Sequence, residues 1–419
     1  MPHSQAIQPS LFISSETNEE KRVDLYENGP RPTVAAQITQ DTPLESLNLN
    51  WRERELPEKE RTKHVHRLHP YLGKYIPQLV EIFLRKYFKP GDTVVDPFAG
   101  SGTTLVQANE LGINSIGFDI SAFNTILCRA KTGIYDLPKV RSEVLDVLHA
   151  TESSRINPAT WLPMFGSDDR DVEQAEHSKY LKEWFAPDAL ADLLSYRSFI
   201  KHYPDQDLLK IILSRAARSA RLTKHFDLDF PKKPQTEPYH CFKHSRICKP
   251  TQDAMQFLRR YSLDSLKRIE EFSRLMTKAK VEIFHADSRE LDIPKIDGVI
   301  TSPPYVGLID YHEQHAYAYH LLGLEDRRGF EIGAAAKGSS INAKKKYQED
   351  IAAVFRRLAA KVKPGGRIIV VAGDRANLYP EIGELANLET EAVVLRHVNR
   401  RTGRRANEFF ESVFIWRKS

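Results

Sequence analysis

The 419-residue sequence contains little cysteine, no long apolar run, and no N-terminal segment in which basic residues precede apolar ones. Its three cysteines, Cys128, Cys241 and Cys248, cannot all pair and are too few for a disulfide scaffold. No apolar run reaches the roughly 18 residues that a bilayer span requires. Because a signal peptide is also lacking, we expect a cytoplasmic protein without a membrane partner. The net charge of +5 permits nucleic-acid binding but does not require it.

A stiff proline turn, Thr301-Ser302-Pro303-Pro304-Tyr305, follows the apolar run from Asp297 to Ile300, which predicts a buried strand. Two adjacent prolines fix the backbone and remove two N–H donors, so the carbonyls of Ser302 and Pro303 are free to accept hydrogen bonds from a ligand. Tyr305 adds a flat ring beside them. This arrangement suits the exocyclic amino group of a planar base, although an isolated turn of this sequence would simply end a strand.

A glycine turn, from Asp96 to Thr104, lies between a predicted strand and a predicted helix that runs to about Leu111. Its glycines, Gly100 and Gly102, allow backbone angles and a close ligand approach that a side chain would block. The next predicted strand ends at Asp119, about 20 residues after the loop, where nucleotide-binding sheets hold a ribose. Since the loop has no Walker lysine, we do not expect a nucleoside triphosphate.

Together the two motifs, DPFAGSGTT and TSPPY, resemble the amino-methyltransferases of DNA, which move a methyl group from S-adenosylmethionine to an exocyclic nitrogen. The serine at position 302 resembles the cytosine-N4 group more than the adenine-N6 group, which more often carries Asp or Asn there. The similarity spans about residues 50 to 418. It includes the segment from His69 to Pro77, which resembles the family's cofactor-side segment. A long insert between Asp119 and TSPPY departs from the usual motif orders of the family.

The resemblance implies an α/β fold, a Rossmann-like methyltransferase sandwich with a mostly parallel seven-stranded sheet, an antiparallel C-terminal edge and a helical insert. We divide the chain into four parts. Residues 1–48 are expected to be mostly disordered or loosely attached, and residues 49–135 to form the cofactor-binding half. Residues 136–280 are the helical insert, a candidate target-recognition region, and residues 281–419 form the catalytic half.

The resemblance also assigns roles to individual residues. Those expected to bind S-adenosylmethionine are Lys74, Asp96, Pro97, Phe98, Ala99, Gly100, Ser101, Gly102, Thr103, Asp119, Asp287 and Thr301. For Asp287, a helix-capping or turn carboxylate is the alternative. The expected catalytic residues are Ser302, Pro303, Pro304 and Tyr305, of which Tyr305 would stack on a base flipped out of double-stranded DNA. No Pro-Cys motif of the carbon-5 cytosine enzymes is present, so we expect direct transfer to nitrogen.

The predicted function is site-specific cytosine-N4 methylation of DNA, as the modification part of a restriction-modification system that could have an endonuclease partner. An adenine-N6 DNA methyltransferase is the first alternative. An RNA methyltransferase and a non-catalytic DNA-binding subunit are two more.

Basic clusters are candidate contacts to the DNA backbone, although a charged stripe can also be an ordinary solvated face. They comprise Arg215, Arg218 and Arg221 in the insert, then Lys344, Lys345, Lys346, Arg404 and Arg405. Cys241, His244 and Cys248, with His240 adjacent, could be read as a zinc site. A structural zinc ion normally uses two well-spaced ligand pairs, whereas these residues crowd into one loop, so we predict packed thiols and no metal.

Overall fold

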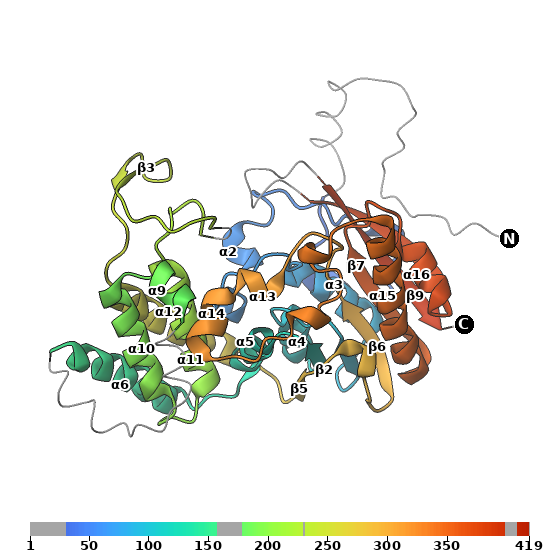
Figure 1. Ribbon diagram of the computed structural model, residues 1–419. Helices are drawn as coiled ribbons and strands as arrows, with labels where there is room; N and C mark the ends of the chain where they lie inside the picture. The colour runs from blue at the N-terminus through green and yellow to red at the C-terminus, as the bar shows by residue number, and fades with distance from the viewer. Residues whose placement is uncertain (1–30, 157–177, 229–230, 399–408, 419) are drawn as a thin grey trace.

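The computed structural model describes residues 31–156, 178–228, 231–398 and 409–418. These residues form a seven-stranded sheet in the order β5-β2-β1-β6-β7-β9-β8 (Figure 1). The first five strands are parallel, and β9 is antiparallel to both β7 and β8. The strands are β1 Thr93–Asp96, β2 Asn114–Asp119, β5 Val281–His285, β6 Ile296–Thr301, β7 Val362–Ala372, β8 Leu388–Val398 and β9 Phe409–Lys418. The predicted Rossmann-like sheet with an antiparallel C-terminal edge is thereby confirmed.

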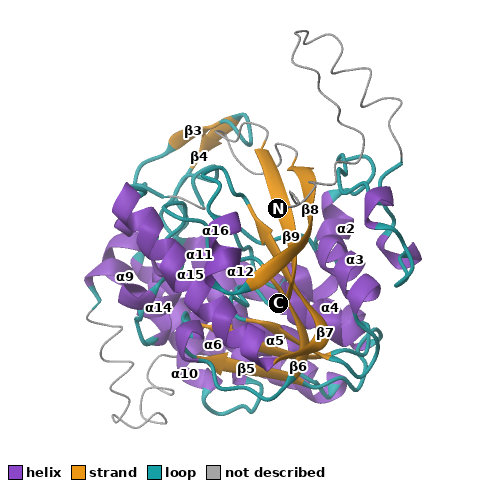
Figure 2. Ribbon diagram, turned by 90° about the vertical axis from the view of Figure 1, so that its right-hand side faces the viewer, coloured by secondary structure: helices purple, strands orange, loops and turns teal. Residues whose placement is uncertain are grey.

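Helices cover both faces of this sheet (Figure 2). Adjacent strand residues point to opposite faces, so Val94 packs with α3 and α4, while Val95 packs with α15 and α16. Because both faces are buried over β1 and β6, these strands are apolar runs without alternation, whereas the edge strand β5 alternates between half-buried and exposed residues. These helices are α3 Pro77–Tyr87, α4 Thr103–Glu110, α15 Ile341–Lys361 and α16 Tyr379–Leu385, and α5 Ala122–Thr132 follows β2. α3 begins with Pro77 at its first turn, where the missing N–H costs nothing.

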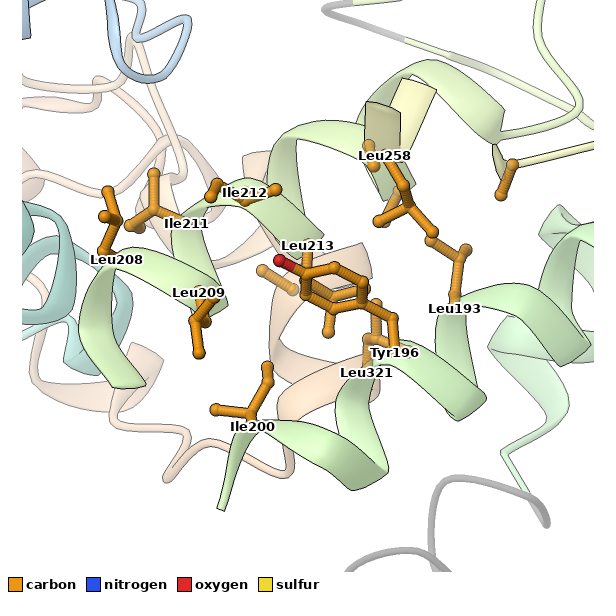
Figure 3. Packing of buried hydrophobic residues seen from close by; sticks show 14 of the residues in the cluster. Leu193, Tyr196, Ile200, Leu208, Leu209, Ile211, Ile212, Leu213, Leu258 and Leu321 are labelled. Atoms are coloured by element: carbon orange, nitrogen blue, oxygen red, sulfur yellow. The ribbon is translucent and has the colours of Figure 1, made fainter. Parts of the chain in front are cut away.

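The insert after α5 is helical and has an apolar core of its own, which includes Leu193, Tyr196 and Leu213 (Figure 3). Residues of α5 and of α14 Ala316–Leu322 join this core and connect the insert to the sheet domain. The helices are α6 Leu137–Ile156, α9 Lys179–Trp184, α10 Pro187–Ile200, α11 Gln206–Ala220 and α12 Met255–Ser273. The sequence showed no strand alternation here, yet a small hairpin of β3 Tyr239–Cys241 and β4 Arg246–Cys248 lies between α11 and α12.

Two other expectations need correction. Residues 31–48 are not loosely attached, because Ala35, Ile38 and Leu47 are buried in the core that α3 contributes to. This polar stretch has few apolar side chains, but those it has pack against the same core as α3. Residues 1–30, which belong to the same predicted segment, lie outside the described residues. The run Pro364-Gly365-Gly366 has the composition of a turn and predicts one, but it is instead part of β7, where the pairing with β6 shifts register. None of the described helices is long and apolar enough to cross a membrane.

Candidate active site

A cavity lies at the carboxyl ends of β1, β2, β5 and β6, the edge at which open α/β sheets bind ligands. Its empty space is about 760 Å³, including the open solvent at the mouth. Residues from the loop after each of these strands line it. They are Pro97, Phe98, Ala99, Gly100, Ser101, Thr103, Asp119, Ile120, Ser121, Asp287, Ser288, Ser302 and Pro304. Most of the cofactor residues expected from the sequence, Lys74 among them, therefore meet at one place.

The glycine loop after β1 adopts backbone angles that favour glycine. Gly100 has a φ of +50° and Gly102 a φ of +75°. A Cβ on Gly100 would lie 3.3 Å from the hydroxyl oxygen of Tyr71, and a Cβ on Gly102 would lie 3.1 Å from Cys128 Sγ. Only glycine meets both conditions at these positions, which keeps the loop close to the cavity floor.

Asp119 at the end of β2 fixes the glycine loop against the cavity. Its Oδ2 accepts the Gly100 N–H over 2.8 Å, and its Oδ1 accepts the Ser121 N–H over 2.8 Å and the Asn124 side-chain amide over 3.1 Å. Burial raises the pKa of the Asp119 carboxyl to about 6, against these hydrogen bonds, which lower it. This carboxylate is thus held rigidly and faces a ligand cavity.

Three predicted cofactor residues, Asp96, Gly102 and Thr301, lie beneath the cavity wall instead of in it. Asp96 is fully buried and accepts hydrogen bonds from Thr301 Oγ1 over 2.6 Å and from the Tyr75 hydroxyl over 3.2 Å. Asp96 and Thr301 therefore join the strands that carry the two motifs, and Gly102 is the N-cap of α4.

The proline turn after β6 presents Ser302 and Pro304 to the cavity, whereas Pro303 is buried and Tyr305 stands beside the wall. The Tyr347 hydroxyl donates to the Pro304 carbonyl over 2.9 Å. The half-buried Tyr305 ring lies against Gly373, where a Cβ would come within 3.2 Å of it. The Tyr305 hydroxyl donates to Glu411 Oε1 over 3.3 Å. Burial raises the pKa of Tyr305 well above its usual value, so the hydroxyl stays protonated. The turn is consequently held at both ends.

Several cavity residues were missed from the sequence, namely Tyr71, Asn124, Tyr311, Phe330, Glu331 and Ile332. Tyr71 lies between His69 and Pro77, the segment assigned to the cofactor side, so that assignment could have identified it. Tyr311 begins α13 Tyr311–Gln314, which precedes α14 Ala316–Leu322 in the segment that covers the cavity. Glu331 comes from a long loop without a local pattern. Its Oε1 accepts the His312 backbone N–H over 3.0 Å.

Comparison with known proteins agrees with this geometry. Residues 13–125 match the DNA methylase family. The chain is 39% identical to the Type II methyltransferase M.MjaII of Methanocaldococcus jannaschii over an alignment 430 positions long. The alignment covers 86% of this chain and 81% of that protein. The chain belongs to the Type II DNA methyltransferases. It is also 25% identical to M.BsoBI of Geobacillus stearothermophilus, over 69% of this chain and 58% of that protein. The family resemblance found in the two motifs is confirmed.

This methyltransferase acts on DNA and uses S-adenosylmethionine as its methyl donor, as its family does. The cavity fits such a donor. Three wall residues, Ser101, Asn124 and Glu331, each have a buried side-chain oxygen without a hydrogen-bond partner among the described residues. Three carboxylates, those of Asp119, Asp287 and Glu331, line the cavity. A sulfonium ligand with amino and hydroxyl donors matches this acceptor-rich wall.

Asp287 has a second role that the sequence left open. It caps the short 3₁₀ helix Ser288–Glu290 by accepting the Arg289 N–H over 2.9 Å, and its carboxylate also pairs with the Arg289 guanidinium. This pairing lowers the pKa of Asp287 although burial opposes it. Asp287 therefore lines the cavity with a charge that is already partly neutralised.

The basic stripe of the insert does not form the expected row of phosphate contacts. Arg215 is buried, pairs with Asp264 over 2.6 Å and stacks over Tyr261; Arg221 is buried over the Tyr317 ring. The three-residue spacing places both side chains inside the protein, so the prediction that Arg215 and Arg221 contact the DNA backbone is wrong. Lys344, Lys345 and Lys346 stand in the first turns of α15, and Arg404 and Arg405 lie outside the described residues.

Proposed function

We propose that this enzyme methylates the exocyclic N4 of cytosine in double-stranded DNA, acting on a base flipped out of the helix. The observation that carries the proposal is the position of the proline turn. Ser302 and Pro304 line the same cavity as the glycine loop and Asp119, so a group held at the turn lies beside the cofactor cavity. A paired base could not reach such a recess, which is why flipping is required.

The turn has the chemistry that an amino group needs. The lone pair of the cytosine amine is delocalised into the ring, which makes the nitrogen a poor nucleophile. We infer that the Ser302 side chain and the Pro303 carbonyl accept its two hydrogens and localise the lone pair. Tyr305 would stack on the base, with its hydroxyl anchored on Glu411. When bound, S-adenosylmethionine supplies an electrophilic methyl group, and the rigid turn orients the amine towards it.

For the cofactor we propose that Asp119 accepts hydrogen bonds from the ribose hydroxyls, as acidic residues do at this position of nucleotide-binding sheets. The glycine loop and Lys74 would complete the site, with Asp287 near the adenine. Lys74 donates to the His66 carbonyl over 2.9 Å, and burial lowers its pKa to about 8. Its ammonium is therefore fixed by the protein before a ligand binds.

The DNA-facing side is proposed to include the exposed basic residues of the β3–β4 hairpin, Lys243, Arg246 and Lys249, since two of the three arginines in the insert stripe are buried. The insert would then be the target-recognition region. Membership of the Type II family also supports a role in restriction-modification, with an endonuclease that recognises the same site. We therefore propose such an endonuclease as a functional partner.

Adenine-N6 transfer is the second candidate, because the same two acceptors would bind an adenine amine equally well. Ser302, in place of an acidic or amide residue, favours cytosine. The test is to express the chain in cells that lack DNA modification of their own and to resolve the nucleosides of their DNA by mass. We expect N4-methylcytosine in DNA, nothing in the RNA fraction, and little from a Tyr305→Ala control. N6-methyladenine would select the alternative, and unmodified DNA with methylated RNA would overturn the proposal.

A further inference from the structure

The β3–β4 hairpin protrudes from the helical insert (Figure 1). It belongs to the segment between α11 and α12, of which residues 221–228 and 231–254 are described. Its two strands are three residues each, and a two-stranded hairpin is at best marginally stable in water. Tyr239, Cys241 and Cys248 form a small buried cluster, while Phe242 and Ile247 are exposed. Apolar packing is thus a weak source of order for a segment of this length.

Both cysteines of this cluster also belong to a group of four converging side chains. They are His225, Cys241, His244 and Cys248, whose ligand atoms all lie within 4.8 Å of one another. Cys241 Sγ is 3.6 Å from His225 Nδ1 and 3.6 Å from His244 Nδ1, and Cys248 Sγ is 3.5 Å from His244 Nδ1. The two imidazole rings meet edge to face with their centroids 4.7 Å apart.

The three sulfur–nitrogen distances match those of a tetrahedron around a zinc ion. With Zn–S bonds of about 2.3 Å and Zn–N bonds of about 2.0–2.1 Å, tetrahedral angles place sulfur and nitrogen about 3.5 Å apart. We propose that His225, Cys241, His244 and Cys248 bind one structural Zn²⁺ ion. Two thiolates and two imidazoles suit zinc, and a set of four protein ligands leaves no open position for catalysis.

The fold explains how one short stretch supplies three ligands. Tyr239 pairs with Cys248 and Cys241 with Arg246, so Cys241 and Cys248 are diagonal neighbours on the same face of the hairpin. Ser245 has a φ of +49° at the turn, next to His244. The fourth ligand, His225, comes from the chain that leaves α11. We predicted packed thiols because Cys241, His244 and Cys248 crowd into one loop. His225 supplies a further ligand from outside that loop, whereas His240 is exposed on the opposite face of β3.

A hydrogen-bonded arrangement without metal is the competing explanation. The Tyr239 hydroxyl accepts the His225 backbone N–H over 2.9 Å and lies 3.0 Å from His225 Nδ1. In that case an imidazole–phenol hydrogen bond would order the loop and the two thiols would be free. The two explanations differ in metal content and in thiol reactivity.

The experiment is metal analysis of the full-length protein, purified without chelators, by inductively coupled plasma mass spectrometry. We expect about one zinc per chain, and a near-complete loss in Cys241→Ser and in His225→Gln. The matched control His240→Gln alters a histidine of the same strand and should keep the zinc. In the intact protein Cys241 and Cys248 should resist alkylation until a strong chelator is added.

A second readout covers variants that do not fold. The wild-type protein is stripped with chelator and titrated with Co²⁺, which should give the absorption spectrum of a tetrahedral site with thiolate ligands. If the wild-type protein has no stoichiometric zinc and takes up neither Zn²⁺ nor Co²⁺, the metal site is wrong and the hydrogen-bonded arrangement is right. Loss of zinc in His240→Gln to the same degree would contradict the assigned ligands. Neither result depends on methyl-transfer activity.

Discussion

Thr301 Oγ1 donates to Asp96 Oδ1 over 2.6 Å and thereby joins the ends of β6 and β1, from residues 205 positions apart in the chain. The glycine loop begins at Asp96 and the proline turn at Thr301. Together with the pairing of β1 and β6, this buried contact sets how the cofactor side of the cavity lies relative to the proposed base-binding side. Asp96 also accepts the Phe98 N–H over 3.1 Å, which directs the loop.

Replacing Thr301 by Val should destabilise the protein by about 1–3 kcal/mol, because it removes a partner of a buried carboxylate while keeping the side-chain shape. Urea unfolding followed by circular dichroism measures the loss. Thr132→Val is the matched control, since its hydroxyl only bonds back to the Cys128 carbonyl within α5. Equal losses in the two variants would show that the contact between β6 and β1 has no special weight.

Cofactor affinity should depend on pH through Asp119. Burial raises the pKa of this carboxyl to about 6, so it is ionised above that pH and increasingly protonated below it. Only the ionised form accepts two hydrogen bonds from a ribose, so affinity should fall by up to about tenfold per pH unit below pH 6. Titration calorimetry with S-adenosylmethionine from pH 8 to 5 measures this.

Two variants complete that experiment. Asp119→Asn should lose this pH dependence, and Asp119→Ala should bind about 1–3 kcal/mol more weakly at pH 8. Unchanged affinity in the Ala variant would remove Asp119 from the site.

Arg215→Gln should lower stability and leave the salt dependence of DNA binding unchanged. The guanidinium pairs with Asp264, whose side chain is 24% exposed, and packs over Tyr261, so its loss should cost roughly 1–3 kcal/mol. Arg274→Gln, at the exposed end of α12, is the control and should change stability by less than about 0.5 kcal/mol. A flatter salt slope in Arg215→Gln would return this residue to the DNA surface.

The parts of the fold that the sequence predicted are those where local pattern and buried position coincide. The strands at Val94 and Val299 are apolar runs bounded by turns, and they are buried between two helical layers. The spacing of charged residues cannot show whether a helix face points into the protein or towards solvent. The arginines at the end of α11 repeat every three residues, yet Arg215 and Arg221 contact partners inside the protein.

Contacts between residues far apart in the chain could not be predicted from the sequence either. Glu331 reaches the cavity from a loop whose sequence has no periodic signal. His225 Nδ1 lies 3.6 Å from Cys241 Sγ, although the two residues are 16 positions apart in the sequence. In contrast, the glycine loop and the proline turn could be found, since each motif requires its own backbone geometry wherever it occurs.

The Tyr305→Ala variant tests most directly whether the proline turn binds the target base. Base–aromatic stacking is worth roughly 1–3 kcal/mol, so methyl transfer to DNA should fall by about one to two powers of ten. Cofactor binding and thermal unfolding should stay close to wild type. Tyr305→Phe should keep most of the activity, because the ring face remains and Glu411 retains its 2.7 Å ion pair with Arg396. If activity, cofactor affinity and stability of the Ala variant all fall in parallel, Tyr305 is a core residue and the base-binding role of the turn is contradicted.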